Sequence, residues 1–195
     1  MKELIARILS SRTIFKSEYF RLIEEVALMG RKKFTYHFRP HGRVVHVVAL
    51  TPRGEVVLER QYRHPVRRWL LEIPAGSVDR GETVLEAARR ELMEETGYSA
   101  KKWKVLGGWY PSPASTNTRA FVVLATGARK IRQARPEATE FIRVILKPFA
   151  EAFQEVGRAR EGTAFFHLGL ALTAIHLGRR YNQTPGNKNI RRQVK

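Results

Sequence analysis

The apolar residues along the first 62 positions predict a series of β-strands. Alternating and β-branched apolar residues mark four segments, each ended by a turn rich in glycine, proline or charged residues. The expected strands are residues 11–26, 33–38, 43–50 and 55–62. The first two would form an antiparallel meander around a turn at 29–32, after an amphipathic start that predicts a short helix.

At Thr83 the pattern changes from strand to helix. Thr83 and Glu86 have the spacing of a capping box, and Gly97 stands where a helix end favours a residue in the left-handed conformation. An apolar stripe would pack this helix on the sheet, and it consists of Val84, Leu85, Ala88 and Leu92. We therefore expect one amphipathic helix over residues 83–97.

The second half of the chain continues the alternation of strands and helices. Further strands are expected at 103–110, 118–125 and 140–146, and further helices at 148–156 and 163–177. This order indicates an α+β domain in which one helix follows a mixed sheet. The expected organisation is an N-terminal helix and β-meander (1–42), a main domain (43–178) and a basic tail (179–195) that is predicted to be disordered.

Composition favours a soluble cytoplasmic protein with a basic surface. The chain has 195 residues, 43% of them hydrophobic, and no cysteine, so it can bury one core but has no disulfide or thiolate metal site. It shows no pattern typical of a secretory signal and no stretch long enough to span a membrane. The formal charge of +18 indicates either nonspecific nucleic acid binding by the tail or simply a solvated, arginine-rich surface.

Three glutamates near the end of the expected helix are candidates for a metal site. Glu91, Glu94 and Glu95 stand at positions i, i+3 and i+4, so on an α-helix they fall within an arc of about 100°. A rigid carboxylate face of this kind suits hard cations such as Mg²⁺. Taken alone, however, the three residues are more typical of a solvated acidic patch.

The whole segment from Gly76 to Tyr98 favours the metal site. It matches the pattern G-x5-E-x7-R-E-U-x-E-E-x-G-U, where U is a bulky aliphatic residue, with Tyr98 at the last U as the departure. This pattern is the Nudix box, and in it the chain resembles the Nudix hydrolase superfamily. The resemblance implies the α+β Nudix fold, a mixed β-sheet packed between helices as an α/β/α sandwich, with an N-terminal antiparallel β-meander used for dimerisation.

Residues 12–160 also follow the order of the ADP-ribose pyrophosphatase branch of that superfamily. The matching motifs that flank the box are Arg60–Arg63, Leu71–Gly76 and Tyr110–Pro113. Ala114 stands where the branch usually has glycine, which leaves the exact sugar open. The branch also implies a homodimer in which an aromatic residue of the N-terminal strands stacks on adenine across the interface; the candidates are Phe15, Tyr19 and Phe20.

The resemblance assigns roles to single residues. The metal ligands would be Glu91, Glu95, Glu94 and the carbonyl of Ala75, holding two or three Mg²⁺ or Mn²⁺ ions. The general base would be Glu140 or, as a second choice, Glu137. The residues near the substrate would be Arg63, Glu72 and Pro113, although Arg63 is equally well explained as an exposed strand-end arginine. The residues that shape the loop and orient the carboxylates would be Gly76, Glu82, Arg90 and Gly97.

Three functions are compatible with the sequence. The first is hydrolysis of the diphosphate of a nucleotide sugar, with ADP-ribose giving AMP and ribose 5-phosphate. The second, motivated by the basic charge, is a Nudix enzyme acting on RNA 5′ ends. The third is a non-catalytic Nudix-fold module that binds RNA or a ribonucleoprotein, which the intact box disfavours because three repelling carboxylates serve no purpose in such a module.

Overall fold

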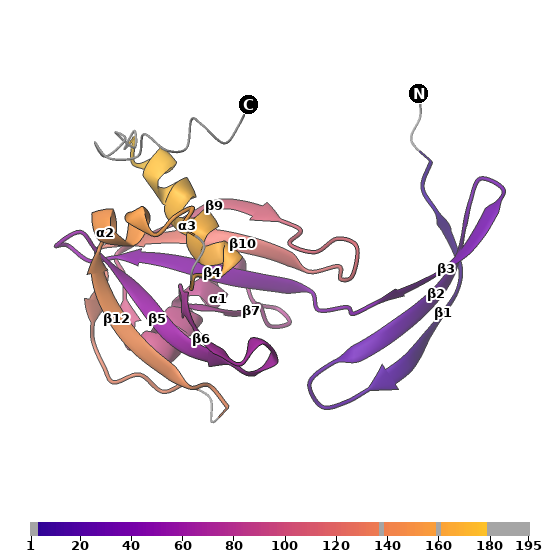
Figure 1. The fold of residues 1–195 in the computed structure, drawn as a ribbon, viewed down its shortest axis with the longest axis horizontal. Coiled ribbons are helices and arrows are strands. Elements are labelled where there is room, and N and C mark those ends of the chain that lie inside the picture. Colours follow the sequence, from indigo (N-terminus) through magenta and orange to yellow (C-terminus); the bar gives the residue numbers. More distant parts are fainter. Residues whose placement is uncertain (1–3, 137–138, 159–160, 179–195) are drawn as a thin grey trace.

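The computed structural model describes residues 4–136, 139–158 and 161–178. The basic tail (179–195) and Glu137 therefore lie outside the described residues, and the predictions made for them stay predictions. Figure 1 shows a main body built on one sheet, with a smaller N-terminal sheet standing to one side of it.

The N-terminal sheet consists of three antiparallel strands: β1 (Arg7–Lys16), β2 (Arg21–Met29) and β3 (Lys32–Phe38). The predicted N-terminal helix is wrong for the described residues, because residues 4–6 are irregular and β1 begins at Arg7. All ten residues of β1 are exposed, so the apolar spacing there reflects pairing with β2 rather than one buried helix face. The predicted strand 11–26 is interrupted at Ser17, whose hydroxyl accepts hydrogen bonds from the N–H groups of Tyr19 and Phe20.

The main sheet is mixed, as expected. Its strands are β4 (Arg43–Leu50), β5 (Glu55–Arg63), β6 (Arg68–Glu72), β7 (Ala75–Ser77), β9 (Lys102–Trp109), β10 (Arg119–Thr126) and β12 (Ile142–Pro148). The order is β12-β5-β4-β10-β9, with β6 paired to β5 and β7 paired to β4. Strands β4 and β10 run parallel, and the other pairs are antiparallel. A separate short ribbon pairs β8 (Tyr98–Ser99) with β11 (Arg129–Lys130).

Helices cover both faces of this sheet, which confirms the α/β/α sandwich (Figure 1). One face packs against α2 (Phe149–Gln154) and α3 (Ala164–His176), with a core that includes Leu58 and Phe166. The other face packs against α1 (Val84–Glu91), with a core that includes Val57 and Leu92. Neighbouring residues of β4 and β5 point to opposite faces, and because both faces are covered these strands are apolar over continuous runs. Among the described residues, no helix has the length and apolar character needed to cross a membrane.

The N-terminal sheet contacts the main body through the loop between β9 and β10. The hydroxyl of Tyr36 donates to the carbonyl of Ala114 (2.7 Å), and the N–H of Arg39 donates to the carbonyl of Ser115 (2.9 Å). The N–H of His41 donates to the side-chain oxygen of Asn117 (3.1 Å). This loop, residues 110–117, therefore lies at the junction of the two sheets.

Candidate active site

Helix α1 is formed by the residues that predicted it. Thr83 Oγ1 accepts a hydrogen bond from the Glu86 N–H (3.2 Å), and Glu86 Oε2 accepts one from the Thr83 N–H (2.8 Å), so the capping box is confirmed. After Glu91 the helix widens into a π-helical turn, η2 (Leu92–Thr96), and it ends at Gly97 with φ of 75°. The last turn is therefore not the regular α-helix on which the 100° arc rests. Widened turns of this kind often occur at functional sites.

Arg90 connects the carboxylates of the box. Its guanidinium donates to both oxygens of Glu82 (3.1 Å each), to Glu91 Oε1 (2.7 Å) and to Glu94 Oε2 (3.2 Å). It also donates to the carbonyl of Ser77 (2.8 Å), at the end of β7. The hydrogen bond from Arg90 is the main cause of a lowered Glu82 pKa. The Arg90 guanidinium thus joins the loop, the helix and the turn, and these contacts are compatible with the orienting role predicted for Arg90 and Glu82.

Gly76 leaves room for the carboxylate of Glu91. A methyl group built on Gly76 would stand 2.0 Å from Glu91 Oε1, so the close approach of strand and side chain requires glycine. Glu91 is only 8% exposed, and burial, partly offset by Arg90, raises its pKa to about 6.

Glu95 is fixed from the same short strand. Its Oε2 accepts a hydrogen bond from the N–H of Ala75 (2.9 Å), and its side chain is buried. Burial and the like charge of Glu59 raise the pKa of Glu95 well above its ordinary value. The structure therefore brings Glu91 and Glu95 together at Ala75–Gly76, with Glu94 more exposed beside them and also bound to Arg90.

Glu59 is a residue of this site that sequence reasoning missed. It lies on β5, directly opposite Glu72 of β6, and it is 1% exposed. Burial, Glu72 and Glu140 together raise its pKa well above the ordinary range of glutamate. A signal was present in the sequence, because Glu59 follows the apolar run Val56–Leu58 at a position where strand alternation points the side chain toward α1.

Arg63 and Glu72, both predicted to lie near the substrate, bind each other. The Arg63 Nε and Nη2 groups donate to the two carboxylate oxygens of Glu72, each at 2.8 Å. Glu72 is buried while the Arg63 side chain is 43% exposed. This side-on pair leaves the Nη1 hydrogens and one Nη2 hydrogen of Arg63 to face other groups. Arg63 is thus more than an exposed strand-end arginine, because it neutralises a buried carboxylate of the site.

The segment that leads to Glu140 is attached to the end of the box helix. The N–H of Ile131 donates to the Gly97 carbonyl (2.9 Å), and the N–H of Arg135 donates to the Glu94 carbonyl (2.7 Å). Glu140 precedes β12 and is close enough to raise the pKa values of Glu59, Glu91 and Glu95 by like-charge repulsion. The structure therefore places the preferred base candidate beside the carboxylates.

The carboxylates of this site are oxygen donors of the kind that Mg²⁺ and Mn²⁺ bind. Glu91 and Glu95 converge on the strand that carries the Ala75 carbonyl, and the buried Glu59 adds a carboxylate oxygen without a hydrogen-bond partner among the described residues. Within the same described part of the chain, no three acidic or histidine side chains already surround one point in the geometry of a metal site. The donor set fits a hard divalent cation that is also coordinated by backbone oxygen and water.

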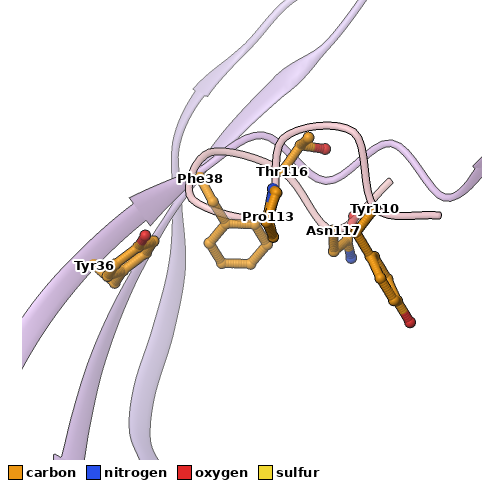
Figure 2. Close-up of a pocket in the computed structure, with 6 residues that line it drawn as sticks. All are labelled: Tyr36, Phe38, Tyr110, Pro113, Thr116 and Asn117. Atoms are coloured by element: carbon orange, nitrogen blue, oxygen red, sulfur yellow. The ribbon is translucent and has the colours of Figure 1, made fainter. Parts of the chain in front are cut away.

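Pro113 lies at a hollow between the N-terminal sheet and the loop 110–117. The volume of this pocket is about 380 Å³, and Figure 2 shows Tyr36 and Phe38 reaching it from β3. The loop side of its lining is formed by Tyr110, Pro113, Thr116 and Asn117. Aromatic rings and proline on two sides make a surface suited to a flat apolar group.

Known proteins are similar to this chain in fold and in sequence. A solved structure described as an ADP compounds hydrolase superposes with a TM-score of 0.80 over 92% of this chain and 100% of that chain, at 22% identity, which bears on the fold. The "ADP-ribose pyrophosphatase" of Bacillus subtilis is 32% identical over 158 residues, or 80% of this chain and 85% of that protein. The "Methanol dehydrogenase activator" of Bacillus methanolicus is 29% identical over 154 residues, or 78% and 83% of the two chains.

A third relative, the "ADP-ribose pyrophosphatase" of Mycobacterium tuberculosis, is 36% identical over 132 residues, covering 67% of this chain and 63% of that protein. The model of the NUDIX domain matches residues 40–166, which include every described carboxylate of the site. Box, sandwich fold and relatives agree, and the chain belongs to the Nudix hydrolase family.

Proposed function

We propose that the protein hydrolyses the diphosphate bond of a nucleoside diphosphate derivative, with ADP-ribose giving AMP and ribose 5-phosphate. The observation that carries the proposal is the convergence of Glu91 and Glu95 on Ala75–Gly76, held there by Arg90 and a backbone N–H. Two relatives named ADP-ribose pyrophosphatase support the choice of substrate.

Divalent cations are part of the proposal. Glu91, Glu95 and the Ala75 carbonyl would hold two or three Mg²⁺ or Mn²⁺ ions, with Glu94 as a further ligand. When bound there, such ions neutralise the diphosphate and make water a better nucleophile. Arg90 and Gly76 keep the carboxylates in place in this scheme, so that little reorganisation is needed when the substrate arrives.

The chain's own residues then account for proton transfer and substrate binding. Water attacks one phosphorus atom, the bridging P–O bond breaks, and Glu140 takes the proton of the attacking water. The Nη1 side of Arg63 would face the phosphates while Glu72 keeps its guanidinium oriented. Pro113 and the aromatic pocket beside it would contact a flat part of the substrate, such as a nucleobase.

A hydrolysis panel tests this proposal. ADP-ribose, other nucleoside diphosphate sugars, dinucleoside polyphosphates and 5′-triphosphate RNA would be compared with Mg²⁺ or Mn²⁺. We expect the highest kcat/KM for ADP-ribose, and a loss of at least ~10²-fold in kcat for Glu95→Gln. A preference for 5′-triphosphate RNA would change the proposed substrate class from nucleotide sugars to RNA ends. A wild-type protein that is inactive on the whole panel would refute hydrolysis of these compounds.

We also propose that the N-terminal sheet binds a second copy of the chain. Its strands and the residues next to them expose apolar side chains to an extent unusual for a free surface, among them Ile5 (90%), Ile8 (57%), Phe15 (50%) and Tyr19 (79%). Phe15 and Phe20 lie 5.4 Å apart between ring centroids and would be available to contact adenine across such an interface. Sedimentation velocity should give a dimer that Ile8→Asp weakens, whereas a monomer at micromolar concentration would contradict this assembly.

A further inference from the structure

Glu59 has an environment that its role in the fold does not explain. Its side chain is 1% exposed, and within the described residues its Oε1 has no hydrogen-bond partner. Taking a carboxylate oxygen out of water without a partner is costly, whereas an apolar side chain like that of the neighbouring Leu58 would fill the space without that cost. A positively charged group next to the Glu59 carboxylate would therefore remove this cost.

The protein itself supplies little positive charge to Glu59. Its cross-strand neighbour is Glu72, and like charges directly opposite one another destabilise a sheet. Arg63 lies near enough to favour a charged Glu59, but two of its N–H groups are committed to Glu72. From the helix and from the segment before β12, Glu91 and Glu140 add further negative charge.

Glu59 also acts on Glu95. After burial, the negative charge of Glu59 is the largest cause of the raised pKa of Glu95, and the charge of Glu91 helps to raise the pKa of Glu59. An unpaired, buried oxygen thus faces a cluster of carboxylates that are the proposed ligands of divalent cations. A cation bridging the cluster would satisfy this oxygen and remove the repulsion at once.

We propose that Glu59 is a further oxygen donor for a divalent cation in this cluster, deeper in the protein than Glu91 and Glu94. The inference rests on the proposed metal dependence of the enzyme, and it adds a ligand from strand β5 to those of the Nudix box. In this arrangement β5 and the box helix hold the same ion, so metal binding ties the sheet to α1.

The test is metal binding without substrate. Free Mn²⁺ would be followed by electron paramagnetic resonance in titrations of the full chain, with Mg²⁺ as competitor, for wild type, Glu59→Gln and Glu59→Leu. We expect the Kd for Mn²⁺ to rise at least ~10-fold in both variants, or the number of bound ions to fall by one. Wild-type affinity and stoichiometry in Glu59→Gln would overturn the proposal.

Stability without metal supplies a second readout. If Glu59 is unpaired until a cation binds, both substitutions leave the melting temperature in chelator unchanged or raise it, and both reduce the increase that Mn²⁺ produces. Unfolding of both variants in chelator would overturn the proposal, because Glu59 would then make a bond that the fold needs.

Thr173→Val is a matched control. Thr173 is also fully buried, and its hydroxyl has no hydrogen-bond partner among the described residues, but it lies on α3 at the other face of the sheet. This variant should keep wild-type Mn²⁺ affinity. Because no substrate is used, a wild type that binds Mn²⁺ through Glu59 but leaves ADP-ribose intact would refute only the proposed function.

Discussion

Replacing Gly76 by alanine should disable the site with little damage to the fold. The new methyl carbon would stand 2.0 Å from Glu91 Oε1, and such contacts are essentially never shorter than 3.0 Å, so the oxygen must retreat by 3.0 − 2.0 = 1.0 Å. Glu91 has little freedom to do so, because it is 8% exposed and bound to Arg90 at 2.7 Å. A misplacement of about 1 Å can cost ~10²-fold in rate, or about 2.7 kcal/mol of transition-state stabilisation.

Gly81→Ala is the control for this variant. Gly81 lies in the loop between β7 and α1 with φ of +89°, and a methyl group there meets nothing within 4 Å. It should cost about 1 to 2 kcal/mol of unfolding free energy through backbone strain while leaving the carboxylates in place. Gly76 is free of that strain, since its φ lies outside the left-handed region.

Initial rates of ADP-ribose hydrolysis over a range of Mg²⁺ concentrations, together with thermal melts, compare the two variants. We expect Gly76→Ala to lose activity and Gly81→Ala to lose stability. Nearly wild-type kcat/KM in Gly76→Ala would refute the inference that the position of Glu91 sets the rate. Equal losses of activity in both variants would point to the whole segment from β7 to α1.

Three further predictions concern the base, the effect of pH and the tail. Glu140→Gln should lower kcat without weakening substrate binding, and a larger effect of Glu137→Gln in the same steady-state assay would move the base to that residue. In chelator, the melting temperature should fall from pH 7 to pH 9, because the pKa of Glu95 is raised in the folded state and the folded protein loses stability as the pH rises toward that pKa. His46, whose pKa is lowered by burial to about 4, is neutral throughout this pH range. A flat profile would contradict the burial of Glu95. Deleting residues 179–195 removes six cationic and no acidic residues, so the formal net charge falls from +18 to 18 − 6 = +12. The truncation should leave kcat/KM for ADP-ribose unchanged and weaken RNA binding at low salt in a filter-binding assay. Loss of ADP-ribose hydrolysis would place the tail in the active site.

The amino-acid sequence alone was sufficient for the features that depend on local spacing. Thr83 and Glu86 define the start of α1 because a capping box involves four consecutive residues, and Gly97 defines the end of the turn η2 that follows α1 because few other residues adopt its positive φ. The sandwich was predicted from the resemblance to the Nudix family, and the apolar run 43–50 predicted only that this segment is a buried strand. The glutamates of the box were found for the same reason: their positions lie within two helical turns.

Tertiary structure decided what depends on residues far apart in the chain. The pairing of Arg63 with Glu72 arises from the register of β5 and β6, and Glu59 becomes buried only when β5 packs with the rest of the fold. An amphipathic start predicted a short helix, yet residues 7–16 form β1 because β2 offers backbone partners that no local pattern reveals. Sequence periodicity shows which side of a helix or strand is apolar. Which element it packs against is decided only when the chain folds, and that packing sets the electrostatic environment of each charged side chain.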